Sequence, residues 1–354
     1  METTQNMTEK KMHYYGIDFL RAFSCIEIIV MHVKANTTYE ISGFYDTFIS
    51  SLTQLVYLFI MVSGFGMCTG YHEKISKNQI DLDSFYGKRY KKTLPFFAFL
   101  LLIAVIIDRN AVTTVEALME LTLTYGLLPN NELDTIGVSW TLGVIFLFYF
   151  LFPFIVFLTK TKKRAVLSFI VSILINYACS YYFFTTKFVI ESFSYRHSFI
   201  YCTPYFFAGA LIYLYRDELI RFVTHFKWIM ACLAIISVIL YYIVPDEIGK
   251  FNVFTLKTLL TCVCLLVLAL GCNGKLSKSK LNTYLSSISM EMYLCQMVLF
   301  RAAEKMHLLY IFGKDWLSFL VCNIIVIIFI IIFVECFKHG TKLILNLTAK
   351  KYQR

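Results

Sequence analysis

Four ionisable side chains interrupt one apolar stretch near the start of the chain, YYGIDFLRAFSCIEIIVMHV at residues 14–33. An ionisable group at mid-membrane costs about 2.5–3.5 kcal/mol on insertion scales, so its presence in a membrane helix indicates function. Arg21 and His32 are eleven residues apart, which puts them on one helix face, together with Asp18. A guanidinium binds anionic oxygens, and an imidazole exchanges protons near neutral pH. The spacing therefore predicts a polar cavity with both groups, roughly 16 Å apart along the axis.

A structural explanation of the same residues is also open. Asp18 and Arg21 are three residues apart and so can form an ion pair on the helix surface. His32 would then only cap the end of the helix near the membrane interface. We favour the functional interpretation, because ionisable residues inside a membrane usually serve a function.

The composition indicates an integral membrane protein of the all-α class. Of 354 residues, 58% are hydrophobic and only 16% are charged, well below the charged share of about a quarter in soluble domains. The apolar residues form blocks of about 20, the length that spans a bilayer. We expect one domain over residues 1–354, a single bundle of ten transmembrane helices. The predicted spans are 14–34, 47–70, 93–109, 138–159, 165–184, 199–216, 227–244, 254–272, 284–302 and 316–337.

The distribution of basic residues predicts the orientation. The net charge is +10, and most of the Lys and Arg residues fall in alternate connecting segments rather than on one surface. This bias predicts that both termini are cytoplasmic, and it argues against a nucleic-acid partner. The eleven cysteines lie mostly inside the spans and lack metal-ligand spacing, so we expect no metal site. Between the third and fourth spans, the amphipathic stretch VEALMELTLTYGLL is expected at the outer interface.

The orientation places further polar residues at two depths. Near the cytoplasmic side we expect Arg21, Ser63, Arg89 and Lys92, with Pro95 as the first residue of the third helix. Glu291 is expected at mid-membrane. The residues expected near the outer side are His32, Trp140, Gln296 and Arg301. A basic inner vestibule suits a polyanion, and the outer group suits a neutral molecule rich in hydroxyl groups.

Five segments, in this order, resemble the acyltransferase-3 family of membrane acyltransferases, which includes O-acetyltransferases of bacterial O-antigens and exopolysaccharides. The first carries the Arg and the His eleven positions later, and the second carries Ser-Gly-Phe. The segments are GIDFLRAFSCIEIIVMH, LFIMVSGFGM, FYGKRYKKTLPFF, SWTLGVIFLFYFLFPF and SSISMEMYLCQMVLF. Two positions depart from the family pattern. Ile145 stands where many members have Glu, and Gln296 where many have His, so the acceptor is not fixed by the resemblance.

The resemblance implies transfer of an acyl group, most often acetyl, from cytoplasmic acyl-CoA to a sugar hydroxyl, with no permanently bound cofactor. His32 would act as general base or as a transient acyl carrier, and Arg21 would orient the donor, with Asp18 beside it. Arg89 and Lys92 would bind CoA phosphates, although positive-inside charges need no ligand. The remaining residues also have purely structural explanations: Ser63 as a packing residue, Trp140 as an interfacial anchor, and Glu291 and Gln296 as interhelical hydrogen-bonding groups. Arg301, near the outer end of the ninth span, would contact the acceptor.

The leading hypothesis is therefore an O-acyltransferase of a cell-surface or lipid-linked glycan in the bacterial plasma membrane. Its expected partners are the lipid bilayer, acyl-CoA, the glycan acceptor and polysaccharide-biosynthesis proteins. Two other hypotheses stay open: a glycan or glycolipid transporter or flippase, and a non-catalytic membrane subunit of a polysaccharide export system. No inverted repeat with paired broken helices is evident, which argues against a secondary transporter.

Overall fold

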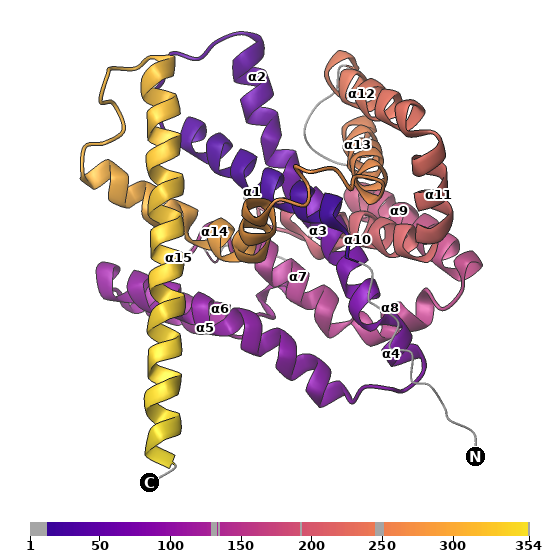
Figure 1. Ribbon diagram of the computed structural model, residues 1–354, viewed down its shortest axis with the longest axis horizontal. Coiled ribbons are helices and arrows are strands. Elements are labelled where there is room, and N and C mark those ends of the chain that lie inside the picture. Colours follow the sequence, from indigo (N-terminus) through magenta and orange to yellow (C-terminus); the bar gives the residue numbers. More distant parts are fainter. Residues whose placement is uncertain (1–12, 129–132, 134, 192, 245–250, 353–354) are drawn as a thin grey trace.

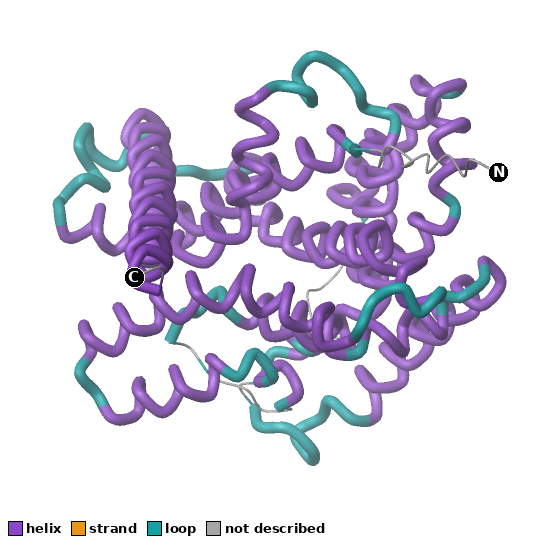
Figure 2. The backbone as a smooth tube through the Cα atoms, turned by 60° about the horizontal axis from the view of Figure 1, so that its bottom comes forward, coloured by secondary structure: helices purple, strands orange, loops and turns teal. Residues whose placement is uncertain are grey.

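The computed structural model describes residues 13–128, 133, 135–191, 193–244 and 251–352, in which helices are the regular structure and strands are absent (Figures 1 and 2). The first half contains α1 (Tyr15–Ala35), α2 (Phe44–Ser51), η1 (Leu52–Gln54), α3 (Leu55–Met67), η2 (Cys68–His72), α4 (Glu73–Ser76), α5 (Leu82–Asp108), α6 (Ala111–Leu121), η3 (Tyr125–Leu127), α7 (Trp140–Phe150) and α8 (Phe152–Leu158). The second half contains α9 (Lys162–Tyr182), η4 (Tyr195–His197), α10 (Phe199–Leu214), α11 (Arg216–His225), α12 (Lys227–Ile243), α13 (Val253–Leu270), α14 (Lys280–Lys305) and α15 (Trp316–Tyr352).

Every one of the ten predicted spans coincides with helix in the structure. Among the described residues, five helical runs are long and apolar enough to cross a membrane: Phe44–Ser76, Leu82–Asp108, Lys162–Tyr182, Val253–Leu270 and Trp316–Leu347. Two bent pairs raise the number to seven, α7 with α8 (60°) and α11 with α12 (101°). α1 and α14 are less apolar because of their ionisable residues. The count of ten crossings and the side of the termini stay predictions.

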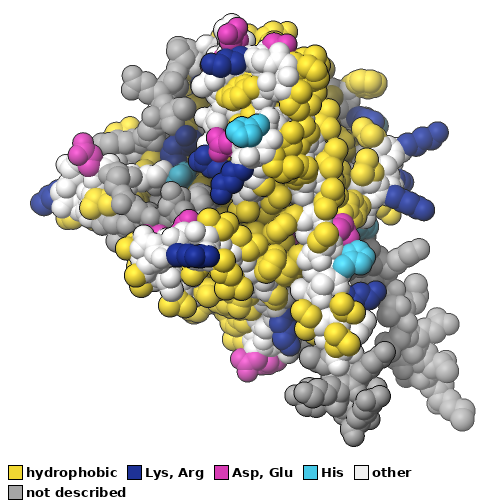
Figure 3. All heavy atoms as spheres, turned by 90° about the vertical axis from the view of Figure 1, so that its left-hand side faces the viewer, with side chains coloured by type: hydrophobic (Ala, Val, Ile, Leu, Met, Phe, Trp, Pro, Cys, Tyr) yellow, Lys and Arg dark blue, Asp and Glu magenta, His cyan; other side chains and the backbone are white. Residues whose placement is uncertain are grey.

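Large hydrophobic side chains cover much of the outer surface of the molecule. On α5, Leu102, Ile106 and Ile107 are each more than half exposed, and α9, α12 and α15 carry similar exposed residues. Figure 3 shows a broad hydrophobic area on the face of the molecule that carries α15. Soluble monomers rarely expose hydrophobic patches of this extent. The exposed faces therefore suit lipid, and the protein is a multi-pass membrane protein.

Glycine allows close packing between α3 and α10 at the centre of the bundle. A Cβ added to Gly64 would lie 2.4 Å from the carbonyl oxygen of Phe206, and one added to Gly209 would lie 2.0 Å from that of Met61. Neither position has room for a methyl group, so the two backbones are in direct contact, as in other membrane helix pairs with small residues. This contact fixes α3, which carries Ser63 one residue before Gly64.

Two local features orient the helices around Arg89 and Lys92. Residues Cys68–His72 form a π turn that continues α3 into α4. The second feature corrects the sequence prediction for Pro95, because α5 already begins at Leu82 and Pro95 lies inside it. Asp81 starts this helix by accepting a hydrogen bond from the Ser84 backbone N–H. The N-cap and the amphipathic turns that follow therefore extend the helix well before the apolar segment.

The amphipathic stretch after α5 forms α6 and packs on the loop that leads to α7. The side chain of Glu120 is fully buried. Its two carboxylate oxygens accept hydrogen bonds from the Thr135 backbone N–H (3.1 Å) and from the Ser139 hydroxyl (3.3 Å). These bonds join α6 to the residue just before Trp140. Burial raises the pKa of the Glu120 carboxyl to about 7, although the hydrogen bond from Ser139 opposes the shift.

Candidate active site

A cavity of about 200 Å³ lies where five helices meet, and its wall is rich in polar side chains. α1 contributes Arg21, α3 contributes Ser63, and α5 contributes Arg89 and Lys92. The polar lining residues from α7 and α14 are Thr141, Tyr149, Ser286, Ser287, Ser289, Glu291 and Tyr293. The structure thus brings together five residues that the sequence singled out, three on separate predicted spans (Arg21, Ser63 and Glu291) and two in the basic segment before the third span (Arg89 and Lys92).

Aromatic rings and one hydroxyl hold the Arg89 guanidinium at the wall of the cavity. Its Nη2 donates to the Tyr71 hydroxyl (2.5 Å), and its Nη1 lies 3.7 Å from the Met67 sulfur. The guanidinium carbon lies 4.7 Å from the ring centroid of Tyr71 and 5.8 Å from that of Tyr149. Tyr71 belongs to the π turn, so this local irregularity helps to position the cation. The buried Nε of Arg89 has no hydrogen-bond partner.

The other two cations complete one positively charged wall. Lys92 follows Arg89 by three residues on α5, so both project from the same side of that helix. The charged groups that act on Lys92 are Arg21, Arg89 and Glu291. Arg21 lies over Gly66, where an added methyl group would be 3.9 Å from Nη2. Three cations against the single carboxylate of Glu291 leave an excess of positive charge.

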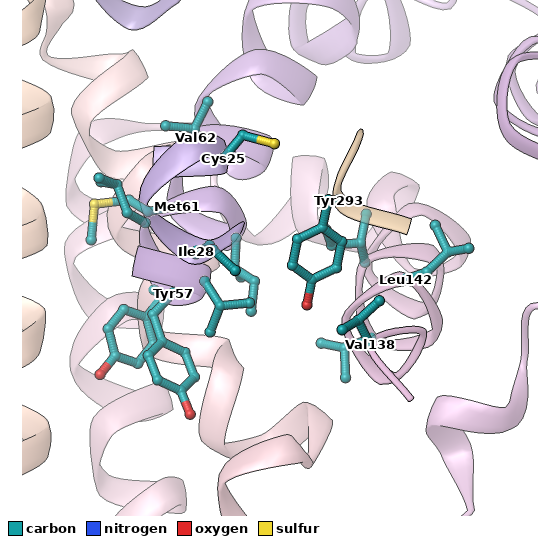
Figure 4. Packing of buried hydrophobic residues seen from close by; sticks show 14 of the residues in the cluster. Cys25, Ile28, Tyr57, Met61, Val62, Val138, Leu142 and Tyr293 are labelled. Carbon is teal, nitrogen blue, oxygen red and sulfur yellow. The ribbon is translucent and has the colours of Figure 1, made fainter. Parts of the chain in front are cut away.

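Two hydroxyl pairs form part of the cavity wall. Ser63 and Tyr149 share a hydrogen bond of 3.1 Å between α3 and α7. The hydroxyls of Thr141 and Tyr293 lie 2.8 Å apart. Thr141 is the lining residue closest to the start of α7, and Tyr293 is the one farthest along α14. In Figure 4, Tyr293 lies between residues of α1 and α3 on one side and Leu142 on the other.

Asp18 does not pair with Arg21, so the ion-pair explanation drawn from the sequence is wrong. The Asp18 carboxylate instead lies 2.6 Å from Nε2 of His13 and accepts a hydrogen bond from the Ser286 hydroxyl (2.9 Å). Asp18 is outside the cavity lining, whereas Ser286 is part of it. Asp18 therefore acts on the cavity through Ser286 rather than by direct contact.

His32 lies outside the cavity, on the last turns of α1. Eleven residues at about 1.5 Å each separate it from Arg21 by roughly 16 Å. Its imidazole does not cap the helix. The cap is the Asn36 side chain, whose amide donates to the His32 carbonyl oxygen (2.9 Å). α1 packs against η1, and near the end of α1 Lys34 donates to the Ser50 hydroxyl (3.2 Å), two residues before η1.

The other predicted outer residues are not gathered into this cavity. Trp140 stacks on the His197 ring, with centroids 4.0 Å apart and planes 14° from parallel. Gln296 is buried on α14, and neither of its amide atoms has a hydrogen-bond partner. Arg301 is exposed and pairs with Glu304 at 2.9 Å, which is a surface contact. Ile145, at the position of the family's Glu, does line the cavity.

The arrangement suits a ligand that is anionic and also has a hydrogen-bond donor. Arg89 Nε and Glu291 Oε2 are buried at the cavity without partners, so one donor and one acceptor are left for a ligand. Oxyanions such as phosphates pair well with guanidinium groups. Among the described residues, no group of three His, Cys, Asp or Glu side chains is placed to hold a metal ion.

Apart from Ser63, sequence reasoning missed the hydroxyl-bearing residues of the site. Thr141 and Tyr149 follow Trp140 by one and nine residues within an apolar segment, and Tyr71 lies in the π turn. The run SSIS before Glu291 was a usable signal, because three serines beside a carboxylate are unusual in a membrane span. Tyr71 carried no such signal, since its direction depends on the π turn.

Exposed apolar helices around an internal cavity with an excess of cationic side chains define a multi-pass membrane protein. The sequence model of an acyltransferase domain, acyltransferase family 3, matches residues 14–335, so the chain belongs to this family. No curated protein and no solved structure matches the chain. The family makes the protein a membrane acyltransferase in general. The acyl group, the acceptor and the catalytic residues do not follow from membership alone.

Proposed function

We propose that the protein transfers an acetyl group from cytoplasmic acetyl-CoA to a hydroxyl group of a surface glycan or lipid-linked sugar. The protein would lie in the bacterial plasma membrane with ten crossings and both termini in the cytoplasm. In this orientation Arg89 and Lys92 face the cytoplasm, where acyl-CoA is made. His32 and Trp140 lie toward the opposite side, where a surface glycan is found.

The observation that carries this proposal is the excess of cations around the cavity. CoA is a polyanion, and Arg21, Arg89 and Lys92 surround a space with only one carboxylate, Glu291. A volume of about 200 Å³ is below the 300–1,000 Å³ typical of pockets for drug-sized ligands. The cavity therefore holds one end of the donor. The exposed side chain of Lys92 stands at its mouth, where phosphates remain in contact with water.

In the proposed reaction, His32 takes the proton of the acceptor hydroxyl while the hydroxyl oxygen attacks the thioester carbonyl. The new C–O bond replaces the C–S bond, and the CoA sulfur leaves as a thiolate that regains the proton from the imidazolium. A relay variant forms an acyl-imidazole first and then transfers the acyl group to the hydroxyl. Both require the thioester to extend outward past the Thr141–Tyr293 pair. Asp18 would be a positioning residue, through its bond to Ser286.

Acetylation and donor binding, measured on the same variants, test the proposal. Proton NMR of surface polysaccharide should show alkali-labile acetyl groups that disappear on gene deletion. His32→Gln should abolish acetylation yet bind acetyl-CoA normally, because His32 does not line the cavity. Arg21→Gln should lose both acetylation and acetyl-CoA binding. His225→Gln, which changes an exposed imidazole, should keep both activities. If His32→Gln and Arg21→Gln both preserve acetylation while deletion stops glycan export, the protein is a transporter or an export subunit.

A further inference from the structure

One further arginine, Arg196, is partly buried at the opposite end of the bundle from the cavity. Its Nη2 donates to the side-chain oxygen of Gln54 (2.6 Å), and Gln54 is only 7% exposed. The guanidinium carbon lies 5.7 Å from the ring centroid of Tyr57 and 5.5 Å from that of Phe254. No carboxylate of the described residues pairs with Arg196, and its buried Nε has no hydrogen-bond partner.

The protein holds this cation in place without neutralising it. Aromatic faces, the Gln54 amide and the nearby Tyr57 and Tyr201 hydroxyls are neutral groups, and they compensate only partly for the lost hydration of a guanidinium, which ordinarily needs an anion when it is enclosed. The turn that carries Arg196 is itself fixed, because the Tyr57 hydroxyl donates to the Arg196 carbonyl oxygen (3.2 Å). On the preceding residue, the Tyr195 hydroxyl donates to the side-chain oxygen of Asn176 (2.5 Å). A positioned guanidinium that no carboxylate of the described residues neutralises, and whose Nε is free to donate, suits an oxyanion.

The location separates Arg196 from the donor cavity and associates it with His32. Gln54, the partner of Arg196, and Met67, the partner of Arg89, are thirteen residues apart on one helical run, about 20 Å along its axis. Gln54 belongs to η1, which packs against α1, the helix that ends just after His32. Arg196 therefore lies at the end of the bundle where the proposed acceptor hydroxyl meets the imidazole.

The surroundings favour a phosphate group at the membrane boundary. His197, the next residue, is exposed and stacks on Trp140. Such aromatic side chains gather at the level of lipid headgroups. Guanidinium pairs with phosphate through two parallel hydrogen bonds, and here Nε is one free donor.

We propose that Arg196 binds the phosphate of the acceptor, and that the acceptor is a phosphate-bearing, lipid-linked saccharide. The assignment rests on the proposed acyl transfer, since it names the acceptor class of that reaction. A lipid-linked saccharide and an ordinary phospholipid headgroup both carry a phosphate ester at the outer membrane boundary. The test therefore separates these two sources.

The experiment measures binding of farnesyl diphosphate, as a small lipid-diphosphate probe, to the full chain in phosphatidylcholine nanodiscs by calorimetry. Arg196→Gln should bind the probe roughly 10- to 100-fold more weakly, as loss of a charge-assisted contact predicts, and Arg196→Lys should be intermediate. Lys305→Gln removes an exposed cation at the same end of the bundle and should bind like the unaltered protein. All variants should bind acetyl-CoA equally, which shows that they are folded.

Each other outcome has a defined meaning. Equal probe affinity in the unaltered protein and Arg196→Gln would overturn the proposal. So would displacement of the probe by phosphatidylglycerol in the nanodisc, because the site would then belong to a phospholipid headgroup. Failure of the unaltered protein to bind acetyl-CoA would instead remove the proposed acyl transfer and leave phosphate binding at Arg196 as a separate fact.

Discussion

Replacement of Arg89 by glutamine is the sharpest perturbation of the donor site. The side chain keeps nearly the same reach and loses its charge, so any effect on binding reports the cation. The native contacts of Arg89 are the Tyr71 hydroxyl, the Met67 sulfur and two aromatic rings, and its Nε is unpaired. Since no carboxylate in the described part of the chain pairs with Arg89, the substitution leaves no buried anion there unpaired and should not unfold the protein.

The magnitude follows from the bonds that the guanidinium makes to phosphate. One hydrogen bond to a charged group contributes about 1.5–3 kcal/mol, and about 1.4 kcal/mol corresponds to a factor of ten in affinity. Loss of one such bond should raise the Kd for acetyl-CoA roughly 10- to 100-fold. Lys88 is the matched control, because it is exposed and immediately precedes Arg89 on α5. Lys88→Gln should change Kd only slightly, and less at high salt.

Calorimetry with two donors distinguishes a phosphate contact from a general effect. Acetyl-CoA carries phosphates, whereas acetyl-pantetheine carries the same thioester without them. Arg89→Gln should weaken acetyl-CoA binding and leave acetyl-pantetheine binding unchanged. Equal losses for both donors would mean that Arg89 shapes the cavity instead of binding phosphate. An unchanged Kd for acetyl-CoA would refute the donor site as a whole.

Two further predictions concern stability. Gly209→Ala places a methyl group against the Met61 carbonyl, so α3 and α10 must separate, at a cost typical of overpacking, about 1–3 kcal/mol. The thermal midpoint of unfolding in detergent should therefore fall. Gly87→Ala is the control, because nothing lies within 4 Å of the added methyl group and the midpoint should not fall. The native Glu120 carboxyl keeps its proton up to about pH 7, whereas the unfolded one loses it near its ordinary value of 4.5. Stability should therefore fall by up to about 3 kcal/mol as pH rises between these values, and Glu120→Gln should remove that slope in thermal unfolding. An unchanged slope in Glu120→Gln would assign the effect to another group.

The sequence located the helices well because apolar length is a local property. Each predicted span coincides with helix, and the close approach expected at Gly64 is present against Phe206. Helix starts were less predictable. Pro95 was taken as the first residue of its helix, yet the Asp81 cap lets the helix begin at Leu82. The bends between α7 and α8 and between α11 and α12 also escaped prediction, since tertiary packing determines them.

The composition of the site was predictable only in part. Its position in an apolar segment identified Arg21, and the family resemblance identified Arg89 and Lys92, but their convergence depends on how α1, α3, α5, α7 and α14 pack. The partner of Asp18 shows the same limit. Helical spacing allowed an ion pair between Asp18 and Arg21. In the structure the partners of Asp18 are instead His13 and Ser286, and Ser286 lies on α14, more than 260 residues away in the chain. Local spacing states which contacts a helix allows, and long-range packing selects among them.

The π turn at Cys68–His72 has a consequence for how the donor site can vary. A π turn holds one residue more than an α turn, so the helix after it is rotated by about 100° relative to an uninterrupted one. Gly64 and its neighbours are therefore oriented by α10, while Tyr71 is oriented by Arg89 on α5. Because of this rotation, the directions of the side chains before and after the π turn are determined by different neighbouring helices. Substitutions around Tyr71 can alter donor selectivity without disturbing the α3–α10 packing on which the bundle depends.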